Sequence, residues 1–385
     1  MSALERRLEG RLVGLDVARC LALVGMIGTH VLDSHTPSGG LAPWQAVAGG
    51  RAAALFAVLA GVSLALMTRR GASPATYAAL ALRALMIALL GLVLGALDTD
   101  IAVILTYYGV LFLLGLPFVR LGARWLLVLG GLWVVVGPVV SQLVRPHLPE
   151  RGVASPYPEQ LAEPGRLLAE LCFTGYYPVV PWLAYLLVGM GLGRLALRCR
   201  ATAAGVALAG LGTAVVSMAV SRGLTALPGV RDRLAADLPI PDGVDPLEVV
   251  AGGMFGQTPV DGGWEWLLVV APHSTTPFDL AHTIGTSLLV IGACLLVESL
   301  VPAAGRVFLA VALGAGAMTL TLYSLHVAMS TPEVWPSEVP GSLRWHLLVV
   351  LAIGAAYAAA GQRGPLETVV GLPTRALRRE RADPV

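Results

Sequence analysis

Long apolar segments follow one another along most of this 385-residue chain, separated by polar stretches of very different length. A segment of about 20 predominantly apolar residues is long enough to cross a bilayer as an α-helix. Within lipid the backbone must satisfy its own hydrogen bonds, so such segments predict helices. We therefore expect an all-α, polytopic membrane helix bundle with about ten transmembrane helices. The ten segments are 12–32, 50–68, 76–97, 101–119, 125–144, 177–197, 202–221, 279–300, 306–328 and 344–361.

Two long connections, 145–176 and 222–278, interrupt the apolar segments. The second contains the sequence WEWLLVV, which is too short to span a bilayer, and its paired Trp residues are typical of the headgroup level. We therefore expect an interfacial or re-entrant piece there. The predicted division is N-terminal helices in 1–221, an extracytoplasmic loop with an interfacial segment in 222–278, a C-terminal three-helix part in 279–361 and a basic cytoplasmic tail in 362–385.

The composition supports a membrane protein, because 56% of the residues are hydrophobic and only 13% are charged. A soluble domain carries roughly a quarter charged residues. A soluble enzyme and nucleic-acid binding are therefore both disfavoured, and the lipid bilayer is the first expected partner. The four Cys residues are scattered without a CxxC motif, which disfavours a disulfide scaffold or a structural metal site.

The placement of Arg residues predicts the orientation of the chain. All 26 basic residues are Arg, and 17 of them fall on one side if the ten segments alternate across the membrane. By the positive-inside rule, both termini are then cytoplasmic in the cell membrane (N-in/C-in). The same topology places every His at the outer side, where a side chain that titrates near neutral pH can move protons. These residues are His30, His35, His147, His273, His282, His326 and His346.

The first apolar segment contains two charged residues, Asp16 and Arg19. A charge at that depth costs about 2–3 kcal/mol unless it is paired or faces a cavity, and i, i+3 spacing lets these two meet. His30 lies on the same helical stripe, roughly 21 Å further along, near the outer boundary. Two interpretations stay open: a structural ion pair below an interfacial His, or a polar track with His30 working at its outer end.

Three further polar groups lie at the outer ends of segments. Arg51 opens the second segment, where snorkelling to the interface explains an Arg equally well. Asp279 and His282 share one helix face, as a carboxylate that orients a general base would, although this spacing also occurs by chance. Tyr323 and His326 form a similar face. No His pair has the spacing of helical metal ligands, so no metal is expected.

Several segments resemble a known family. RLVGLDVARCLALVGMIGTHV (11–31) resembles the opening helix of heparan-α-glucosaminide N-acetyltransferase-like membrane proteins, with Arg11, Asp16 and Arg19 at matching positions and Cys20 in place of the usual Gly. GRAAALFAVLAGVSLAL and GYYPVVPWLAYLLVGMGLGR resemble later helices of bacterial members. PHSTTPFDLAHTIGTSLLVIGACLL and GAMTLTLYSLHV are similar to an uncharacterised bacterial membrane family that often accompanies this N-terminal half.

The resemblance implies a transmembrane acyltransferase that passes an acyl group, often acetyl from cytosolic acetyl-CoA, to a hydroxyl or amine of a glycan or lipid-linked acceptor outside. It implies a polar residue at the outer end of the first helix and a His in the following loop as the chemical groups, with a His as general base. Here these are His30 and His35, and the choice between them stays open. Arg51 or Arg19 would stabilise the oxyanion or grip the donor phosphates. The sequence leaves open whether the chain forms a homodimer. The alternative function is a membrane transporter or lipid flippase with an intramembrane charged pair.

Overall fold

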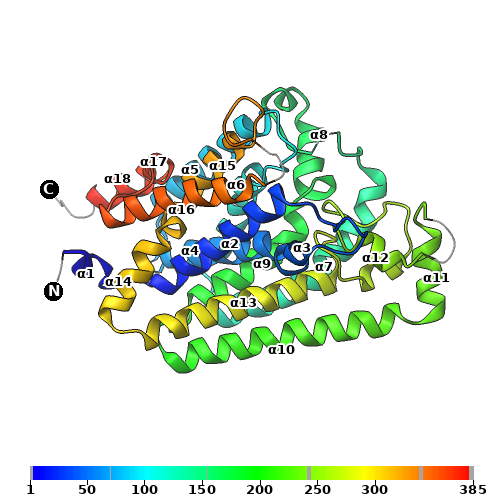
Figure 1. Ribbon diagram of the computed structural model, residues 1–385, viewed down its shortest axis with the longest axis horizontal. Helices are drawn as coiled ribbons and strands as arrows, with labels where there is room; N and C mark the ends of the chain where they lie inside the picture. Colours follow the sequence, from blue (N-terminus) through cyan, green and yellow to red (C-terminus); the bar gives the residue numbers. More distant parts are fainter. Residues whose placement is uncertain (1–2, 70, 153, 241–243, 338–340, 381–385) are drawn as a thin grey trace.

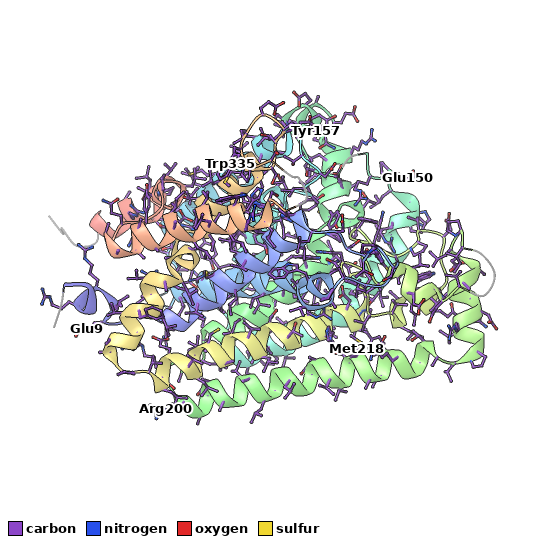
Figure 2. The ribbon with its side chains drawn as sticks, viewed as in Figure 1. Glu9, Glu150, Tyr157, Arg200, Met218 and Trp335 are labelled. Atoms are coloured by element: carbon purple, nitrogen blue, oxygen red, sulfur yellow. The ribbon has the colours of Figure 1, made fainter. Side chains whose placement is uncertain are left out.

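The computed structural model describes residues 3–380 except 70, 153, 241–243 and 338–340, and it is a bundle of roughly aligned helices (Figure 1). Both ends of the chain lie at the same end of this bundle, together with Glu9 and Arg200, which we call the terminal end (Figure 2). Glu150 lies at the opposite end, which we call the loop end.

The helices follow one another in three groups. The first is α1 (Ala3–Leu8), α2 (Val13–Val31), α3 (Pro43–Ala48), α4 (Arg51–Met67), α5 (Pro74–Gly95), α6 (Leu105–Gly115) and α7 (Ala123–Val144). The second is α8 (Pro164–Ala169), α9 (Val179–Gly193), α10 (Arg200–Thr225), α11 (Pro228–Ala236) and α12 (Pro246–Val250). The third is α13 (Pro277–Leu300), α14 (Ala303–Ala312), α15 (Thr319–Met329), α16 (Leu343–Ala359), α17 (Pro365–Val369) and α18 (Leu372–Glu380).

The all-α membrane bundle is confirmed, with six helices in the described part of the chain that are long and apolar enough to cross a membrane. A bent pair, Pro164–Thr174 with Val179–Gly193 at 56°, raises this to seven if it forms one span. The other predicted segments hold shorter helices. For example, segment 306–328 is interrupted by a 3₁₀ turn at Gly314–Ala317, and segment 101–119 becomes helical only at Leu105.

The helices differ in how much of their surface the protein itself covers. In α2, 67% of an apolar 18-residue stretch is buried inside the protein, whereas in α10 only 22% of such a stretch is. Large apolar side chains such as Leu208 and Val216 of α10 are exposed, which is the expected arrangement where lipid is the solvent. The core of the bundle therefore contains α2, and α10 runs along its edge (Figure 1).

A carboxylate from α13 fixes the start of α2. The backbone N–H groups of Val13 and Gly14 donate to Glu298 Oε1 and Oε2 over 3.0 and 2.8 Å, and Arg306 donates to Oε1 over 3.3 Å. The first N–H groups of a helix lack intrahelical partners, and the helix dipole favours an anion there. Glu298 therefore anchors the helix that carries Asp16, Arg19 and His30.

Part of the long connection 222–278 folds as a small unit at the loop end. We call the described residues of 228–276, that is 228–240 and 244–276 with α11 and α12, the cap. Trp266 is fully buried in the cap's own apolar cluster with Leu234 and Val250, and its indole N–H donates to Asp237 Oδ2 over 2.9 Å. Trp264 is 54% exposed. Of the two Trp residues that we expected at a lipid interface, Trp266 is instead held inside the cap because its N–H finds an acceptor there.

Candidate functional site

A cavity of about 500 Å³, which we call the outer cavity, lies at the loop end between the end of α2 and the cap. His30, the penultimate residue of α2, and His35, in the following loop, both line it. The structure therefore brings together the two His residues that the sequence singled out. Other polar groups around this cavity are Thr29, Ser34, Gln45, Asp100, Arg151, Tyr176, Tyr177 and His273.

The cap forms part of the wall of the outer cavity through backbone contacts. Gln45 Nε2 donates to the carbonyl of Gly252 over 2.9 Å, and Arg151 donates to the carbonyl of Phe255 over 2.6 Å. A Cβ added to Gly252 would press on the imidazole of His35, so the cap backbone passes directly against that ring. His35 is exposed, and its Nδ1 lies 3.0 Å from Ser34 Oγ.

His30 is the first member of a chain of three imidazoles. Its Nδ1 lies 3.1 Å from His326 Nε2, and these two rings are parallel within 5°. Nδ1 of His326 lies 3.0 Å from Nδ1 of His346, whose Nε2 lies 3.1 Å from the carbonyl oxygen of Ser337. The rings come from α2, α15 and α16, and the second and third are fully buried. Sequence reasoning picked out His326 but gave His346 no role.

His273 is a residue of this cavity that sequence reasoning did not single out as a site residue. It has a left-handed backbone with φ of 58°, and its ring packs edge-on against Tyr176 and Tyr177 at 5.1 and 5.5 Å. Its buried Nδ1 has no hydrogen-bond partner among the described residues. Burial lowers the pKa of His273 to about 4, so its imidazole is neutral at pH 7.

This lowered pKa predicts that acid destabilises the protein. Below the ordinary pKa of 6.5, His273 binds a proton in the unfolded chain, whereas in the folded protein it stays neutral down to about pH 4. The free energy of unfolding therefore falls as the pH drops from 6.5 to 4. We expect about 1–2 kcal/mol of this loss between pH 7 and pH 5 to disappear in His273→Asn, since Asn tolerates a positive φ. Denaturation midpoints of the purified protein at both pH values measure it, and an equal acid loss in variant and wild type would contradict it.

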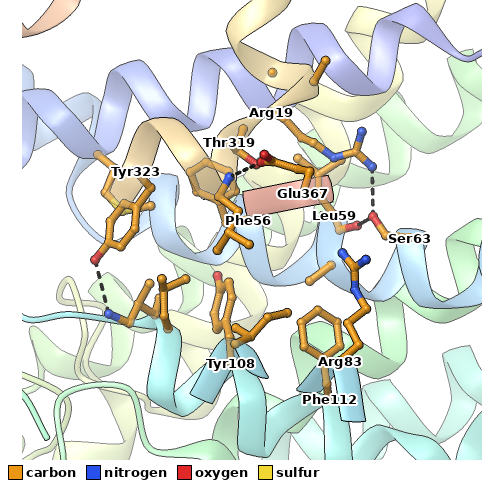
Figure 3. A pocket seen from close by; sticks show the side chains of 18 of the residues that line it. Arg19, Phe56, Leu59, Ser63, Arg83, Tyr108, Phe112, Thr319, Tyr323 and Glu367 are labelled. Carbon is orange, nitrogen blue, oxygen red and sulfur yellow. Dashed lines mark hydrogen bonds between the residues drawn. The ribbon is translucent and has the colours of Figure 1, made fainter. Parts of the chain in front are cut away.

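A second, inner cavity of about 280 Å³ lies deeper in the bundle, between α2, α4, α5, α6 and α15 (Figure 3). Arg19 and Arg83 point into it from α2 and α5. Arg19 donates to Asp16 Oδ1 over 2.7 Å and to Ser63 Oγ over 2.9 Å, and Arg11 binds Asp16 Oδ2 over 2.6 Å. The predicted i, i+3 ion pair is therefore formed, and it faces a cavity.

A carboxylate from the C-terminal tail also lines the inner cavity. Glu367 of α17 accepts from the backbone N–H of Leu320 over 2.7 Å, at the start of α15 (Figure 3). It also accepts from the hydroxyl of Thr321 over 2.6 Å. The inner cavity thus carries two guanidinium groups and one carboxylate. Sequence reasoning assigned no role to Arg83 or Glu367, because nothing local ties either of them to α2.

Arg51, Asp279 and His282 line a separate cavity of about 260 Å³ near the loop end. Arg51 Nε donates to His282 Nε2 over 3.2 Å, and His282 Nδ1 lies 3.0 Å from the carbonyl of Ala214, to which it donates. Asp279 instead accepts from the backbone N–H of Thr275 over 3.1 Å. Of the two interpretations left open for this face, the carboxylate–imidazole hydrogen bond is absent between these two described residues, since Asp279 turns back to the N–H of Thr275 just before its own helix. Both nitrogens of His282 are engaged.

Within the described residues, no group of three or more His, Cys, Asp or Glu side chains could hold a metal ion. A family model described as "Heparan-alpha-glucosaminide N-acetyltransferase, catalytic" matches residues 11–224, which is more than half of the chain. That range contains Asp16, Arg19, His30 and His35, whereas His326 and His346 lie outside it. A search of curated proteins found no match.

Proposed function

The chain belongs to the heparan-alpha-glucosaminide N-acetyltransferase catalytic family, and on this premise we propose that it transfers an acyl group, chiefly acetyl, across the membrane. The donor is an acyl-CoA bound at the terminal end, and the acceptor is a hydroxyl or amine, as in a glucosaminide or a lipid-linked sugar, at the loop end. The family is one of membrane acetyltransferases, so the proposal concerns which donor, acceptor and residues this chain uses.

One observation carries the proposal: the basic inner cavity and the His-lined outer cavity adjoin at Met26, one helical turn from His30. Met26 lines both cavities, and Tyr323 lines the inner cavity with its ring 6.5 Å from that of His30. Arg19 and Arg83 suit the phosphates of CoA, because guanidinium groups bind phosphate bidentately. The acyl end of the donor would then extend toward the loop end and reach His30, while the acceptor would enter the outer cavity next to the cap.

The reaction needs a base at the outer cavity. Nε2 of His30 takes the proton from the acceptor hydroxyl or amine, and the freed lone pair attacks the thioester carbonyl carbon. The new C–O or C–N bond forms, the C–S bond breaks, and the CoA thiolate leaves with the proton returned from the imidazolium. His35 lines the same cavity and would orient the acceptor.

We also propose ten spans with both termini cytoplasmic in the cell membrane. The seven candidate spans become ten when the shorter apolar helices, Leu105–Phe118, Ala303–Ala312 and Leu343–Ala359, also mark crossings, the second of them together with α15. The Arg-rich loops then face the cytoplasm. The shared position of the two termini at one end of the bundle, opposite the cap, supports this (Figure 1).

Purified protein in liposomes, given acetyl-CoA labelled on the acetyl group and a glucosaminide probe, tests the function. We expect label on the probe, or slow thioester hydrolysis without it. Folded protein that neither binds CoA nor turns it over would overturn the proposal. Movement of labelled lipid or solute in the same liposomes would then favour the transporter alternative.

The inner cavity predicts a specific defect in donor binding. In Arg83→Gln we expect the donor KM to rise about tenfold, with kcat within a factor of about two, because one charge-assisted contact to phosphate is worth at least 1.4 kcal/mol. Arg124→Gln is the matched control, because Arg124 is exposed at the start of α7 and does not line the inner cavity. Steady-state kinetics over a range of acetyl-CoA concentrations measures both, and equal KM values in the two variants would contradict this donor site.

A further inference from the structure

The contact between His346 and Ser337 fixes which atom is the donor in each hydrogen bond of the three imidazoles. A backbone carbonyl oxygen can only accept a hydrogen bond, so the 3.1 Å contact between His346 Nε2 and Ser337 O requires a proton on that nitrogen. A neutral imidazole carries a single N–H, and therefore Nδ1 of His346 holds a lone pair. The Nδ1 of His326, 3.0 Å away, must then be the donor to it.

The same reasoning extends to the outer cavity. With its proton on Nδ1, a neutral His326 has a lone pair on Nε2, and His30 must donate its Nδ1 proton across the 3.1 Å contact. Nε2 of His30 is left as a lone pair, and no hydrogen bond from the described residues ends on it. A single arrangement of three neutral rings satisfies all three contacts.

We propose that His326 and His346 are positioning residues that hold His30 in its Nδ1–H tautomer and so present a basic Nε2 to the outer cavity. This proposal rests on the proposed function, in which His30 is the base. The general base of such a reaction needs one nitrogen free and the other bonded, and a partner on Nδ1 fixes which is free. When His30 takes a proton, its Nδ1–H stays bonded to the lone pair of His326, which stabilises the imidazolium.

Other groups around His30 do not supply this function. Tyr323, from the same helix as His326, approaches with its ring edge-on at 6.5 Å and its hydroxyl accepts from the N–H of Ile104. The remaining titratable or charged groups line the outer cavity, and among the described residues none of them forms a hydrogen bond with Nδ1 of His30. They are His35, Asp100, Arg151, Tyr176, Tyr177 and His273.

A pair of nearly isosteric substitutions separates hydrogen bonding from packing. His346→Asn places an amide oxygen near the position of Nδ1, where it accepts from His326, whereas His346→Leu fills the same space without an acceptor. If His346 only packs, Leu should be tolerated as well as Asn in this fully buried site. If it positions His30, we expect kcat to fall roughly tenfold in His346→Leu and less than about twofold in His346→Asn, with the donor KM unchanged in both.

Two further readouts complete the test. The acid limb of the kcat/KM profile should move to lower pH in His346→Leu and stay in place in His346→Asn. Only Leu removes the acceptor for the Nδ1–H of His326, and this makes the imidazolium form of His30 less stable. Nitrogen NMR of protein labelled at its seven His residues reports each tautomer without any turnover. We expect a protonated Nδ1 on His30 in the wild type and in His346→Asn, and a mixture in His346→Leu.

The outcomes separate this inference from the function on which it rests. A protonated Nε2 on His30 in the wild type, or kinetics of folded His346→Leu equal to those of the wild type, would overturn the positioning role. If the wild type transfers no acyl group, the proposed function fails, and the NMR tautomers still decide whether the imidazole chain is ordered as inferred.

Discussion

Replacing His30 by alanine should lower kcat for acyl transfer by about 10²–10⁴-fold while the donor KM changes little. Its ring lines the outer cavity and adjoins Tyr323 of the inner cavity, so its loss removes the base without removing the arginines that would hold the donor. His35→Ala should cost less than about tenfold, because His35 is exposed and its Nδ1 contacts the neighbouring Ser34. Single-turnover transfer from labelled acetyl-CoA measures the chemical step for both variants.

The matched control for these variants is His147→Ala. His147 is exposed in the connection that follows α7 and lines none of the three cavities described above. We expect it to retain wild-type kcat. A larger loss in His35→Ala than in His30→Ala, with both proteins folded, would move the base to the loop and contradict the assignment to α2.

The features of the candidate site that could be predicted from the sequence lie on one helix. The Asp16–Arg19 pair follows from i, i+3 spacing alone, and His30 at the outer end of the same stripe follows from helical periodicity. Both outcomes belong to α2, whose residues keep their relative positions in any packing. The resemblance to the family also rested mainly on this helix, and the family match includes it.

The parts that could not be predicted depend on contacts between helices. His346 joins the site because α16 packs beside α15, and no spacing within either helix indicates which His faces which. Asp279 and His282 have the spacing of a catalytic pair, yet Asp279 lies in the first turn of α13, where backbone N–H groups compete for its carboxylate. Local periodicity cannot weigh that competition, so it left the catalytic and the chance interpretation of this spacing open.

The number of spans shows the same limit. Hydropathy adds up apolar residues across a break, so it read 306–328 as one helix, although the small residues of Gly314–Ala317 form a 3₁₀ turn between α14 and α15. That turn packs against α2: a Cβ on Gly316 would collide with the carbonyl of Asp16. The break thus lets α2 approach closely and starts α15 at the depth from which His326 reaches His30.

Placing a side chain at Gly189 should destabilise the bundle. Gly189 of α9 and Gly61 of α4 face each other where these helices cross, and a Cβ on Gly189 would overlap the carbonyl oxygen of Val58. Small residues let helix backbones approach within a membrane, where packing takes the place of the hydrophobic effect. Neither backbone can yield without separating two central helices, because α9 is buried around nearly its whole circumference.

A matched glycine makes the sign of this effect diagnostic. Gly205 on α10 is exposed, and a Cβ there would meet nothing within 4 Å. Elsewhere in a helix, replacing Gly by Ala stabilises by roughly 0.5–1 kcal/mol, so Gly205→Ala should be neutral or stabilising. Gly189→Ala should instead cost about 1–3 kcal/mol, and Gly189→Leu more than that. Thermal unfolding and size-exclusion profiles of the purified variants measure both, and a Gly189→Ala protein as stable as Gly205→Ala would show that α4 and α9 do not cross at this distance.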